Sequence, residues 1–438
     1  MFQLSSIYEN SLAKENTRLT SIDVLRGIVM ALMALDHCRD YFHQYAFEFA
    51  PEDLEFTTPI VFYTRWITHF CAPVFVFLTG ISAYLYQQKN NASNKDMVRY
   101  LVIRGLILIL LEITIVRFAW RFYIDYSSIG GLVLWGIGWS MIALAGILYL
   151  PRKVILGLSL VILFTHNFLD PIEVSGNKFL ELIWAFLHKC TFVPLTENFG
   201  INILYPVLPM IGLISLGYYI GKWFTGEYNS EIRAGYLFYT GMIMVFLFLG
   251  LRVMQLVTEQ YAYLFYLNVG DLENKWTVFF KTILGYIVEN YGDASPWQVQ
   301  ENFTYTLISF FNTTKYPMSL LYILMTLGPA LMALSVLENK NNIFTKVMTV
   351  YGKVPLFYYV LHLFLIHTLA ILIAVLSHLD RMQEILKGDW KSLSENYGFS
   401  MPVVYLIWLC VLALLYPACN AYNRLKAKNK KHGLLSYL

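Results

Sequence analysis

The chain alternates between long apolar runs and shorter polar segments. Ten of the apolar runs approach or exceed the roughly 20 residues that a helix needs to cross a bilayer. They cover residues 22–42, 60–87, 100–122, 129–149, 153–169, 202–223, 234–256, 318–337, 354–377 and 402–423. Because only helices and closed barrels satisfy their own backbone within lipid, this pattern predicts an all-α polytopic integral membrane protein with about ten transmembrane helices.

Composition agrees with a membrane protein and argues against other classes. Of the 438 residues, 57% are hydrophobic and 14% are charged, whereas soluble domains average about 25% charged residues. The net charge of +3 gives no support to nucleic-acid binding. Membrane lipid is the expected surrounding, and the oligomeric state stays open. The five cysteines form no CxxC pair, so we expect neither a disulfide framework nor a metal site.

Basic residues gather in alternate loops, and this asymmetry sets the predicted orientation. The loops on the N-terminal side hold the larger share of the lysines and arginines. They include Lys89, Lys95, Arg99 and Arg104. The first loop on the opposite side, residues 43–59, holds four acidic residues and no lysine or arginine. By the positive-inside rule, both termini should therefore be cytoplasmic, which requires an even number of spans.

Three parts are expected along the chain. They are a polar cytoplasmic N-terminal segment at 1–20, a single transmembrane domain at 21–424 and a basic cytoplasmic tail at 425–438. Within the domain, residues 257–316 are predicted to form a long external loop rich in aromatic residues. Loops of this length are often lids or binding elements, but tyrosine and tryptophan also anchor amphipathic segments at the membrane interface. Both interpretations stay open.

The first predicted span carries charged side chains, which are rare in lipid and usually mark a function. Arg26 and His37 are eleven residues apart, so they share one helix face about 16 Å apart along the axis. Asp23 lies one turn before Arg26 and can pair with it. A structural interpretation also exists, because Arg26 could extend toward the headgroups and Asp23 could be a first-turn acid.

Further ionisable residues surround His37 near the predicted outer end of this span. Asp36 and Asp40 bracket it, although Asp36 points about 100° away around the helix. Arg39 can reach Asp36 along the helix. A purely structural histidine is the alternative, but two ionisable residues on one face of a span favour a functional site.

The second predicted span carries a polar stripe of its own. Arg65 and His69 are four residues apart and share a face, with Pro73 one turn further along. Pro73 is expected to kink the helix, and Gly80 to permit close packing. Because the first two spans are sequence neighbours that should pack antiparallel, we expect His37, Arg65 and His69 to cluster in the outer half of the membrane.

The ninth predicted span contains two more histidines, His362 and His367. Five residues correspond to about 500° of helix rotation, so the two side chains diverge by about 140°. They should not bind one metal ion together. Either could face the site, and the other could be a packed, hydrogen-bonded histidine.

Four blocks of sequence, in order along the chain, are similar to a known family. They are Arg18-Leu-Thr-Ser-Ile-Asp23-Val-Leu-Arg26-Gly with Asp36-His37, Arg65-Trp-Ile-Thr-His69 continuing to Gly80, Phe311-Asn-Thr-Thr-Lys315-Tyr316-Pro317, and Pro355-Leu-Phe-Tyr-Tyr-Val-Leu-His362. The blocks resemble the heparan-alpha-glucosaminide N-acetyltransferase catalytic-domain family, especially its bacterial members, within a wider set of transmembrane acyltransferases. The acyltransferase-3 branch of that set carries an arginine, ten residues and a histidine on one helix, and Arg26 and His37 match this spacing.

The resemblance implies an enzyme that takes an acyl group, with acetyl expected, from cytoplasmic acyl-CoA. The enzyme would deliver that group to a sugar amine or hydroxyl at the opposite membrane face. Cytoplasmic cations would meet the phosphates of CoA. The candidates for donor binding are Arg26, Arg18, Lys95, Arg99 and Arg104. A bacterial inner (cytoplasmic) membrane is the expected location.

Acyl transfer needs a base for the acceptor proton and a donor for the oxyanion. His37 is the predicted base, assisted by Asp36 or Asp40, and Arg65 could stabilise negative charge. His69 could instead be the base or a transient acyl carrier. Further site candidates are Asp23, Arg39, Asp40, Lys315, Tyr316 and His362.

One departure from the family concerns the loop between the first two helices. Family members carry an active-site histidine there, whereas residues 44–58 contain none and His43 only borders the loop. The acceptor could therefore differ from glucosamine.

Two other functions compete with an acyltransferase. A transporter or flippase for a glycan or lipid would use the same buried charges without CoA, and a non-catalytic scaffold or sensor would do no chemistry. Binding of CoA discriminates between them.

Overall fold

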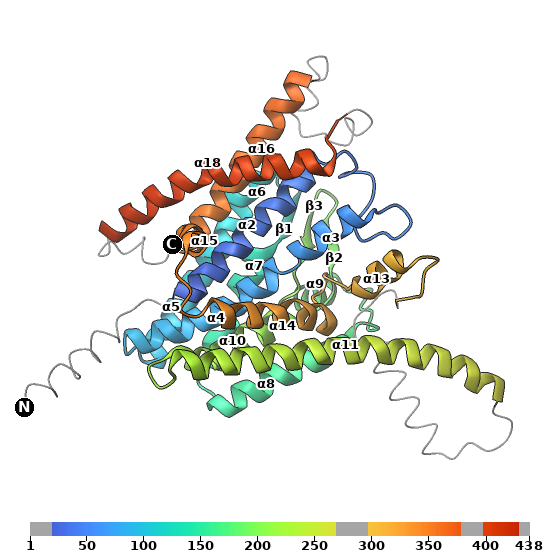
Figure 1. Ribbon diagram of the computed structural model, residues 1–438, viewed down its shortest axis with the longest axis horizontal. Coiled ribbons are helices and arrows are strands. Elements are labelled where there is room, and N and C mark those ends of the chain that lie inside the picture. The colour runs from blue at the N-terminus through green and yellow to red at the C-terminus, as the bar shows by residue number, and fades with distance from the viewer. Residues whose placement is uncertain (1–19, 269–296, 378–396, 429–438) are drawn as a thin grey trace, which may run out of the picture.

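The computed structural model describes residues 20–268, 297–377 and 397–428, and it is mostly helical (Figure 1). Helices α2, α4, α10 and α14 form the interior, with their apolar side chains in one continuous core. The helices and helical turns, in chain order, are α2 (Thr20–Phe42), α3 (Pro59–Thr68), α4 (Cys71–Lys89), α5 (Asn94–Leu111), η1 (Glu112–Val116), α6 (Arg117–Arg121), α7 (Val133–Ile147), α8 (Arg152–Thr165), η2 (His166–Leu169), α9 (Lys178–Leu187), α10 (Val207–Ile220), η3 (Gly221–Phe224), α11 (Ser230–Asn268), α13 (Phe303–Phe311), α14 (Leu320–Leu337), α15 (Ile343–Gly352), α16 (Pro355–Ser377) and α18 (Met401–Lys428).

Helical structure occupies every predicted span, so an all-α polytopic membrane protein is confirmed. The predicted count of ten transmembrane helices is not confirmed. Within the described ranges, seven helices are long and apolar enough to cross a membrane. Three predicted spans fall outside that set. The helix α2 and the continuous run from α5 to α6 carry several charged residues, and α7 has only 15 residues.

The predicted external loop contains more helix than expected. Helix α11 continues to Asn268, beyond the predicted end of its span at residue 256, and α13 (Phe303–Phe311) lies within the same segment. The part at 269–296 lies outside the described residues. The roles of a lid or of an interfacial anchor therefore stay predictions.

A small sheet accompanies the helices. The strands β1 (Ser128–Gly131), β2 (Thr191–Thr196) and β3 (Phe199–Ile203) form it in the order β1-β3-β2. Strand β1 runs parallel to β3, and β2 runs antiparallel to it. Residues 178–193, which lie between the fifth and sixth predicted spans, form α9 and the start of β2, and Ala185 of α9 packs on Val193 and Ile203.

The second predicted span is broken into α3 and α4 rather than kinked at Pro73. Proline has no N–H and crowds the carbonyl four residues earlier, which here belongs to His69. The chain turns at His69 and Phe70, and Pro73 falls in the first turn of α4. The freed carbonyl of His69 instead accepts a hydrogen bond from the hydroxyl of Tyr322 at 2.7 Å.

Glycines bring two helix pairs into backbone contact. A Cβ atom on Gly27 of α2 would lie 1.9 Å from the carbonyl oxygen of Met348 in α15, and one on Gly80 of α4 would lie 2.0 Å from that of Ile214 in α10. Close approach through small residues is a main source of packing energy between membrane helices. The close packing expected at Gly80 is confirmed.

Substituting Gly27 with valine should therefore destabilise the protein. The new side chain must push α2 away from α15, and overpacking of this kind costs about 1–3 kcal/mol. We expect a lower thermal midpoint in detergent, measured on the purified full chain. Gly146→Val on α7 is the matched control, because a Cβ there meets nothing within 4 Å. An equal loss in both variants would contradict the interpretation.

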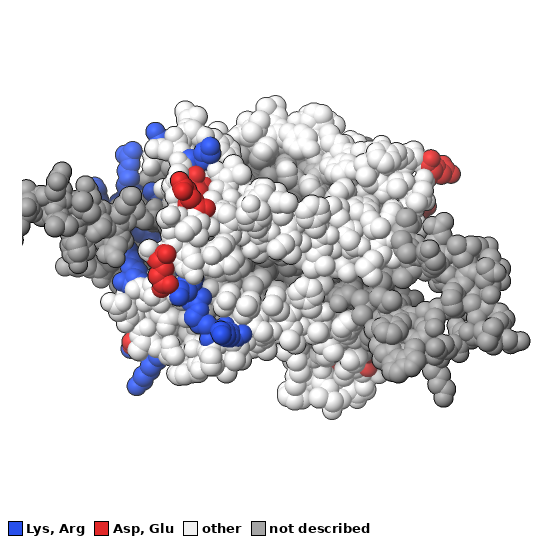
Figure 2. All heavy atoms as spheres, turned by 60° about the horizontal axis from the view of Figure 1, so that its bottom comes forward, with Lys and Arg blue, Asp and Glu red and all other residues white. Residues whose placement is uncertain are grey.

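Positive charge gathers toward one end of the molecule, as one face shows (Figure 2). Exposed lysines and arginines lie at or near the turns between α4 and α5, α7 and α8, and α14 and α15. These residues are Lys89, Lys95, Arg99, Lys153, Lys340 and Lys346. This basic end is the side that the sequence predicts to be cytoplasmic.

Candidate active site

A cavity of about 940 Å³ lies inside the bundle. Helices α2, α4, α5, α7 and α16 and the loop before α14 supply most of its wall. Along α2, Met30, Met33 and His37 lie on one stripe of the wall, and Asp36, Arg39 and Asp40 also line it. Ten residues of helix correspond to about 15 Å, so the cavity follows α2 through about half of a bilayer core. One part of the cavity is apolar, and the part around His37 is charged.

His37 meets a second histidine from the far end of the chain. Its Nδ1 atom lies 2.8 Å from Nε2 of His362 on α16, and the indole of Trp120 lies edge-on at 4.7 Å. Nδ1 of His362 lies 3.0 Å from the carbonyl oxygen of Tyr358. The sequence left open which of the two α16 histidines faces the site. His362 contacts His37, whereas Nδ1 of His367 lies 2.8 Å from the carbonyl oxygen of Ala119.

The contacts determine which nitrogen of His37 carries the proton when both rings are neutral. The carbonyl of Tyr358 can only accept, so Nδ1 of His362 must donate and its Nε2 must be unprotonated. Nδ1 of His37 then donates to that nitrogen. The lone pair of His37 is therefore on Nε2, and His37 lines the cavity. This arrangement gives the cavity a histidine oriented to accept a proton.

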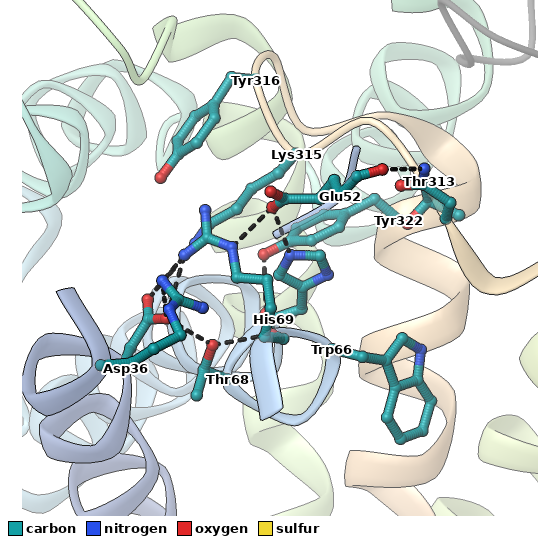
Figure 3. A network of polar contacts seen from close by, with 12 residues as sticks. Asp36, Glu52, Trp66, Thr68, His69, Thr313, Lys315, Tyr316 and Tyr322 are labelled. Atoms are coloured by element: carbon teal, nitrogen blue, oxygen red, sulfur yellow. Dashed lines mark hydrogen bonds and ion pairs between the residues drawn. The ribbon is translucent and has the colours of Figure 1, made fainter. Parts of the chain in front are cut away.

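Asp36 is the centre of a charged network in the same part of the cavity (Figure 3). Its two carboxylate oxygens lie 3.1 and 2.9 Å from Nη1 of Arg65. Thr68 donates to it at 2.8 Å, Nη2 of Arg39 lies at 3.0 Å, and Nζ of Lys315 lies at 3.9 Å. Arg39 also contacts Asp40 at 2.5 Å. Asp36 therefore balances several cations at once, which agrees with the supporting role that its position on the helix predicts.

Asp36→Asn should strongly destabilise the protein. Removing one partner of a buried ion pair costs about 3–5 kcal/mol, because the remaining charges lose their compensation. We expect a clear drop in the thermal midpoint of the purified protein. Asp40→Asn is the control, because that side chain is 38% exposed and, among the described residues, forms an ion pair with Arg39 alone. Equal midpoints for the two variants would be the contrary result.

Glu52 joins the network from the acidic loop. Its carboxylate accepts from Nε of Arg65 at 2.6 Å, and its backbone carbonyl accepts from the side chain of Asn312 at 2.9 Å. Burial acts to raise the pKa of Glu52, but Arg65 and His69 together more than offset this and hold the pKa below the usual range. Arg65 is therefore held between two carboxylates, Asp36 and Glu52.

Of the three residues expected to cluster, His37 and Arg65 line the cavity together, and Arg65 and His69 share the carboxylate of Glu52. His69 sits at the break between α3 and α4, where its ring packs edge-on against Tyr322 at 5.3 Å and its Nε2 lies 3.5 Å from Glu52. Its exposed fraction is 1%, and it is absent from the cavity wall. His69 lies outside the wall because the chain turns at residues 69 and 70, ahead of the kink expected at Pro73.

Lys315 extends from the loop between α13 and α14 into the cavity. Its Nζ lies over the ring of Tyr316 at 5.2 Å. Among the described residues, no hydrogen-bond acceptor lies within 3.5 Å of Nζ. An ammonium has three donors, so Lys315 presents unused N–H groups to the cavity. The loop is anchored by η2, since Nε2 of His166 contacts the carbonyl of Met318 at 2.8 Å and Asn167 accepts from the N–H of Leu320 at 2.9 Å.

One of the predicted donor-binding cations lines the cavity. Arg104 lies on the wall and donates to the hydroxyl of Tyr100 at 2.5 Å. It sits 16 residues before Trp120, about 24 Å along the helix axis, and thus toward the basic end. Lys95 and Arg99 are exposed and outside the wall. Arg18 lies outside the described residues.

Arg26 does not reach the cavity wall. Its guanidinium contacts Asp23 at 3.0 Å, as predicted, and donates to the hydroxyl of Ser82 at 2.9 Å and to the carbonyl of Gly352 at 3.1 Å. It therefore joins α2 to α4 and α15. A role for Arg26 in donor binding stays a prediction.

His43, which borders the loop where the family carries a histidine, also lies outside the cavity wall. It forms a bridge with Phe399. Burial lowers the pKa of His43 to about 4, and the nearby Arg39 acts in the same direction. Across the described ranges, no group of three or more His, Cys, Asp or Glu side chains is placed to hold a metal ion.

Sequence reasoning missed several residues of the site. Trp120, Asn312 and Tyr359 line the cavity. Asn312 and Tyr359 fall within two of the resembling blocks, but nothing there separates them from ordinary packing residues. Trp120 lies outside the four blocks and has no motif.

The described residues thus form a helical membrane protein with a buried cavity that His37 lines. The family model for heparan-alpha-glucosaminide N-acetyltransferase, catalytic, matches residues 18–257, which is more than half of the chain. The protein therefore belongs to this family. The match includes the first two of the four resembling blocks and ends before the other two. No curated protein matches the chain.

Proposed function

We propose that the protein takes an acetyl group from cytoplasmic acetyl-CoA and transfers it to a sugar amine or hydroxyl at the opposite membrane face. The observation that carries this proposal is the orientation of His37, whose free Nε2 belongs to a residue of the cavity wall. The name of the family describes acetyl transfer of this kind. The proposed location is a bacterial inner membrane.

The shape of the cavity supports entry of the donor from the basic end. Arg104 would contact a phosphate of CoA, and the apolar stripe of Met30 and Met33 would accompany the flexible arm of the donor. The thioester would then lie near His37. The acceptor would approach from the other end of the cavity, between Asp40, Glu52 and Asn312. Both substrates would meet without crossing the membrane.

The chemistry of the step is a direct acyl transfer. The acceptor nitrogen or oxygen attacks the thioester carbonyl while Nε2 of His37 takes its proton. The ammonium of Lys315 donates to the oxyanion that forms. The carbon–sulfur bond then breaks, and the CoA thiolate takes the proton from His37. His362 keeps its contact with Nδ1 of His37 throughout, and this contact holds the ring in place.

An acyl-enzyme route through His69 has less support. A transient acyl carrier must reach the thioester carbonyl, whereas the ring of His69 is buried against Tyr322 and outside the cavity wall. Arg65 is likewise engaged by Asp36 and Glu52, so Lys315 is the better oxyanion donor.

Purified full-length protein in sealed vesicles tests the function. Acetyl-labelled CoA is supplied at the face that carries the termini, and a panel of envelope sugars at the other. We expect acceptor-dependent label on the sugar and stoichiometric release of CoA. Movement of sugar across the vesicle with no dependence on CoA would favour a transporter and overturn the proposal.

A further inference from the structure

A second, smaller pocket of about 300 Å³ opens near the basic end. Its wall combines amides, tyrosines and a single ionic side chain, Arg152. The lining residues are Tyr84, Gln87, Gln88, Asn91, Ala92, Asn94, Leu148, Leu150, Arg152, Ile155 and Tyr218. No carboxylate is among the described residues of this wall. The pocket is therefore suited to a ligand that is anionic and rich in hydrogen-bonding groups.

The pocket continues the line of the main cavity. On α4 the main cavity ends at Thr79 and the pocket begins at Tyr84; on α7 the wall passes from Met141 to Leu148. These steps are five and seven residues, about 8 and 10 Å along each helix. Both steps run toward the basic end. A long ligand that fills the main cavity from that end would pass this pocket.

Arg152 is held in position for an anion. Its guanidinium lies over the rings of Tyr84 and Tyr219, at 4.8 and 5.1 Å, and its Nη2 donates to the carbonyl of Tyr219 at 2.6 Å. Its Nη1 has no hydrogen-bond partner, and no acid lies within 4 Å among the residues described. Stacking and the backbone contact fix the side chain, while its charge stays uncompensated.

The amides of the wall are already ordered. Gln87 accepts from the hydroxyl of Tyr218 and donates to Asn94 at 3.1 Å, and Asn94 donates to the carbonyl of Leu148 at 3.3 Å. Gln88 and Asn91 remain exposed at the rim. Amides recognise the edges of a nucleobase through paired donors and acceptors, whereas a lipid headgroup would need only the cation. The wall therefore favours a nucleotide.

We propose that this pocket binds the phosphorylated nucleoside end of the CoA donor, with Arg152 facing a phosphate and the amides facing the base. The proposal rests on the proposed function. It divides the donor among three places, with the thioester at His37, the arm beside Met30 and Met33, and the nucleoside at Arg152. Arg104 lies between the last two.

Binding of CoA to the purified full chain, in nanodiscs of phosphatidylcholine, tests the assignment. Arg152→Gln should weaken the binding of CoA at least about tenfold, because a charge-assisted hydrogen bond to a phosphate is lost. Acetyl-pantetheine lacks the nucleotide, so its turnover should be unchanged. Lys153→Gln is the matched control, because Lys153 is exposed and outside the pocket. Ala92→Trp fills the pocket and leaves Arg152 unchanged, and this variant should weaken the binding of CoA as well.

The outcomes separate the two proposals. If the wild type binds no CoA, the proposed function itself fails. If the wild type binds CoA and both Arg152→Gln and Ala92→Trp bind it equally well, only the pocket assignment fails. A second set of nanodiscs, which contain phosphatidylglycerol, tests whether the pocket binds an anionic lipid headgroup instead. Loss of retained anionic lipid in Arg152→Gln, with unchanged CoA affinity, would identify a headgroup as the ligand and overturn the nucleotide assignment.

Discussion

His37→Gln should lower the turnover number for acetyl transfer by about 10²- to 10⁴-fold, the range typical for removal of a general base. Glutamine keeps a polar side chain that can still contact His362, but it cannot take up the acceptor proton. The Michaelis constant for acetyl-CoA should change little, because His37 acts on the acceptor during the reaction. Steady-state kinetics with labelled acetyl-CoA measure both constants.

Two comparisons make this result specific. His43→Gln changes a histidine six residues away that lies outside the cavity wall, so its turnover should stay near that of the wild type. Thermal midpoints show whether each variant is folded. Normal turnover in a folded His37→Gln protein would remove His37 from the chemistry and return attention to the other buried histidines.

Lys315→Met should lower the turnover number by about 10²- to 10³-fold, as found when an oxyanion donor is removed. Methionine preserves the approximate length of the side chain and removes its charge and donors. Asp36 retains Arg65 and Arg39 as partners in this variant. The protein should therefore still fold, and the loss should fall on turnover rather than on substrate affinity.

The control for this variant is Lys346→Met, on the exposed surface of α15, for which we expect no change. Lys315→Arg should keep part of the activity, because the positive charge remains with different geometry. If Lys315→Met raises only the Michaelis constant of the acceptor, Lys315 binds the ground state and the assignment to the oxyanion is wrong.

The sequence predicted the single-helix features of the site well. The spacing of Arg26, Asp23 and His37 depends on helical period alone, and the Asp23–Arg26 pair forms as expected. The divergence of His362 and His367 follows from the same geometry. Nothing in the sequence pairs His37 with His362, because 325 positions separate them and only the packing of α2 against α16 brings them together.

Loop residues were the hardest to place. In the sequence, Glu52 is one of several acids that mark an external loop. Its contact with Arg65 depends on how that loop folds over α3. Lys315 was known only from a resembling block. Its entry into the cavity depends on η2, where His166 and Asn167 fix the following residues. Loops carry no periodicity from which such contacts could be calculated.

On the donor side, charge alone could not separate Arg26 from Arg104. Both lie toward the end predicted to be cytoplasmic, and either could meet a phosphate. The difference comes from backbone packing, since Gly27 and Gly352 bring α2 and α15 together so closely that Arg26 reaches the carbonyl of Gly352. Arg104 instead lines the cavity, next to Gly105, which packs α5 closely against the backbone of α7 at Gly138.

The charged network around Asp36 also determines how the site responds to membrane potential. Its formal charges cancel, with three acids opposed by three bases. They are Asp36, Asp40, Glu52, Arg39, Arg65 and Lys315. At a membrane potential of 100 mV, moving one uncompensated charge across the whole membrane changes its free energy by about 2.3 kcal/mol. A neutral cluster has no net charge on which the potential can act. The acetyl group of the proposed reaction is neutral as well, so we expect its transfer to proceed equally in energised and de-energised membranes.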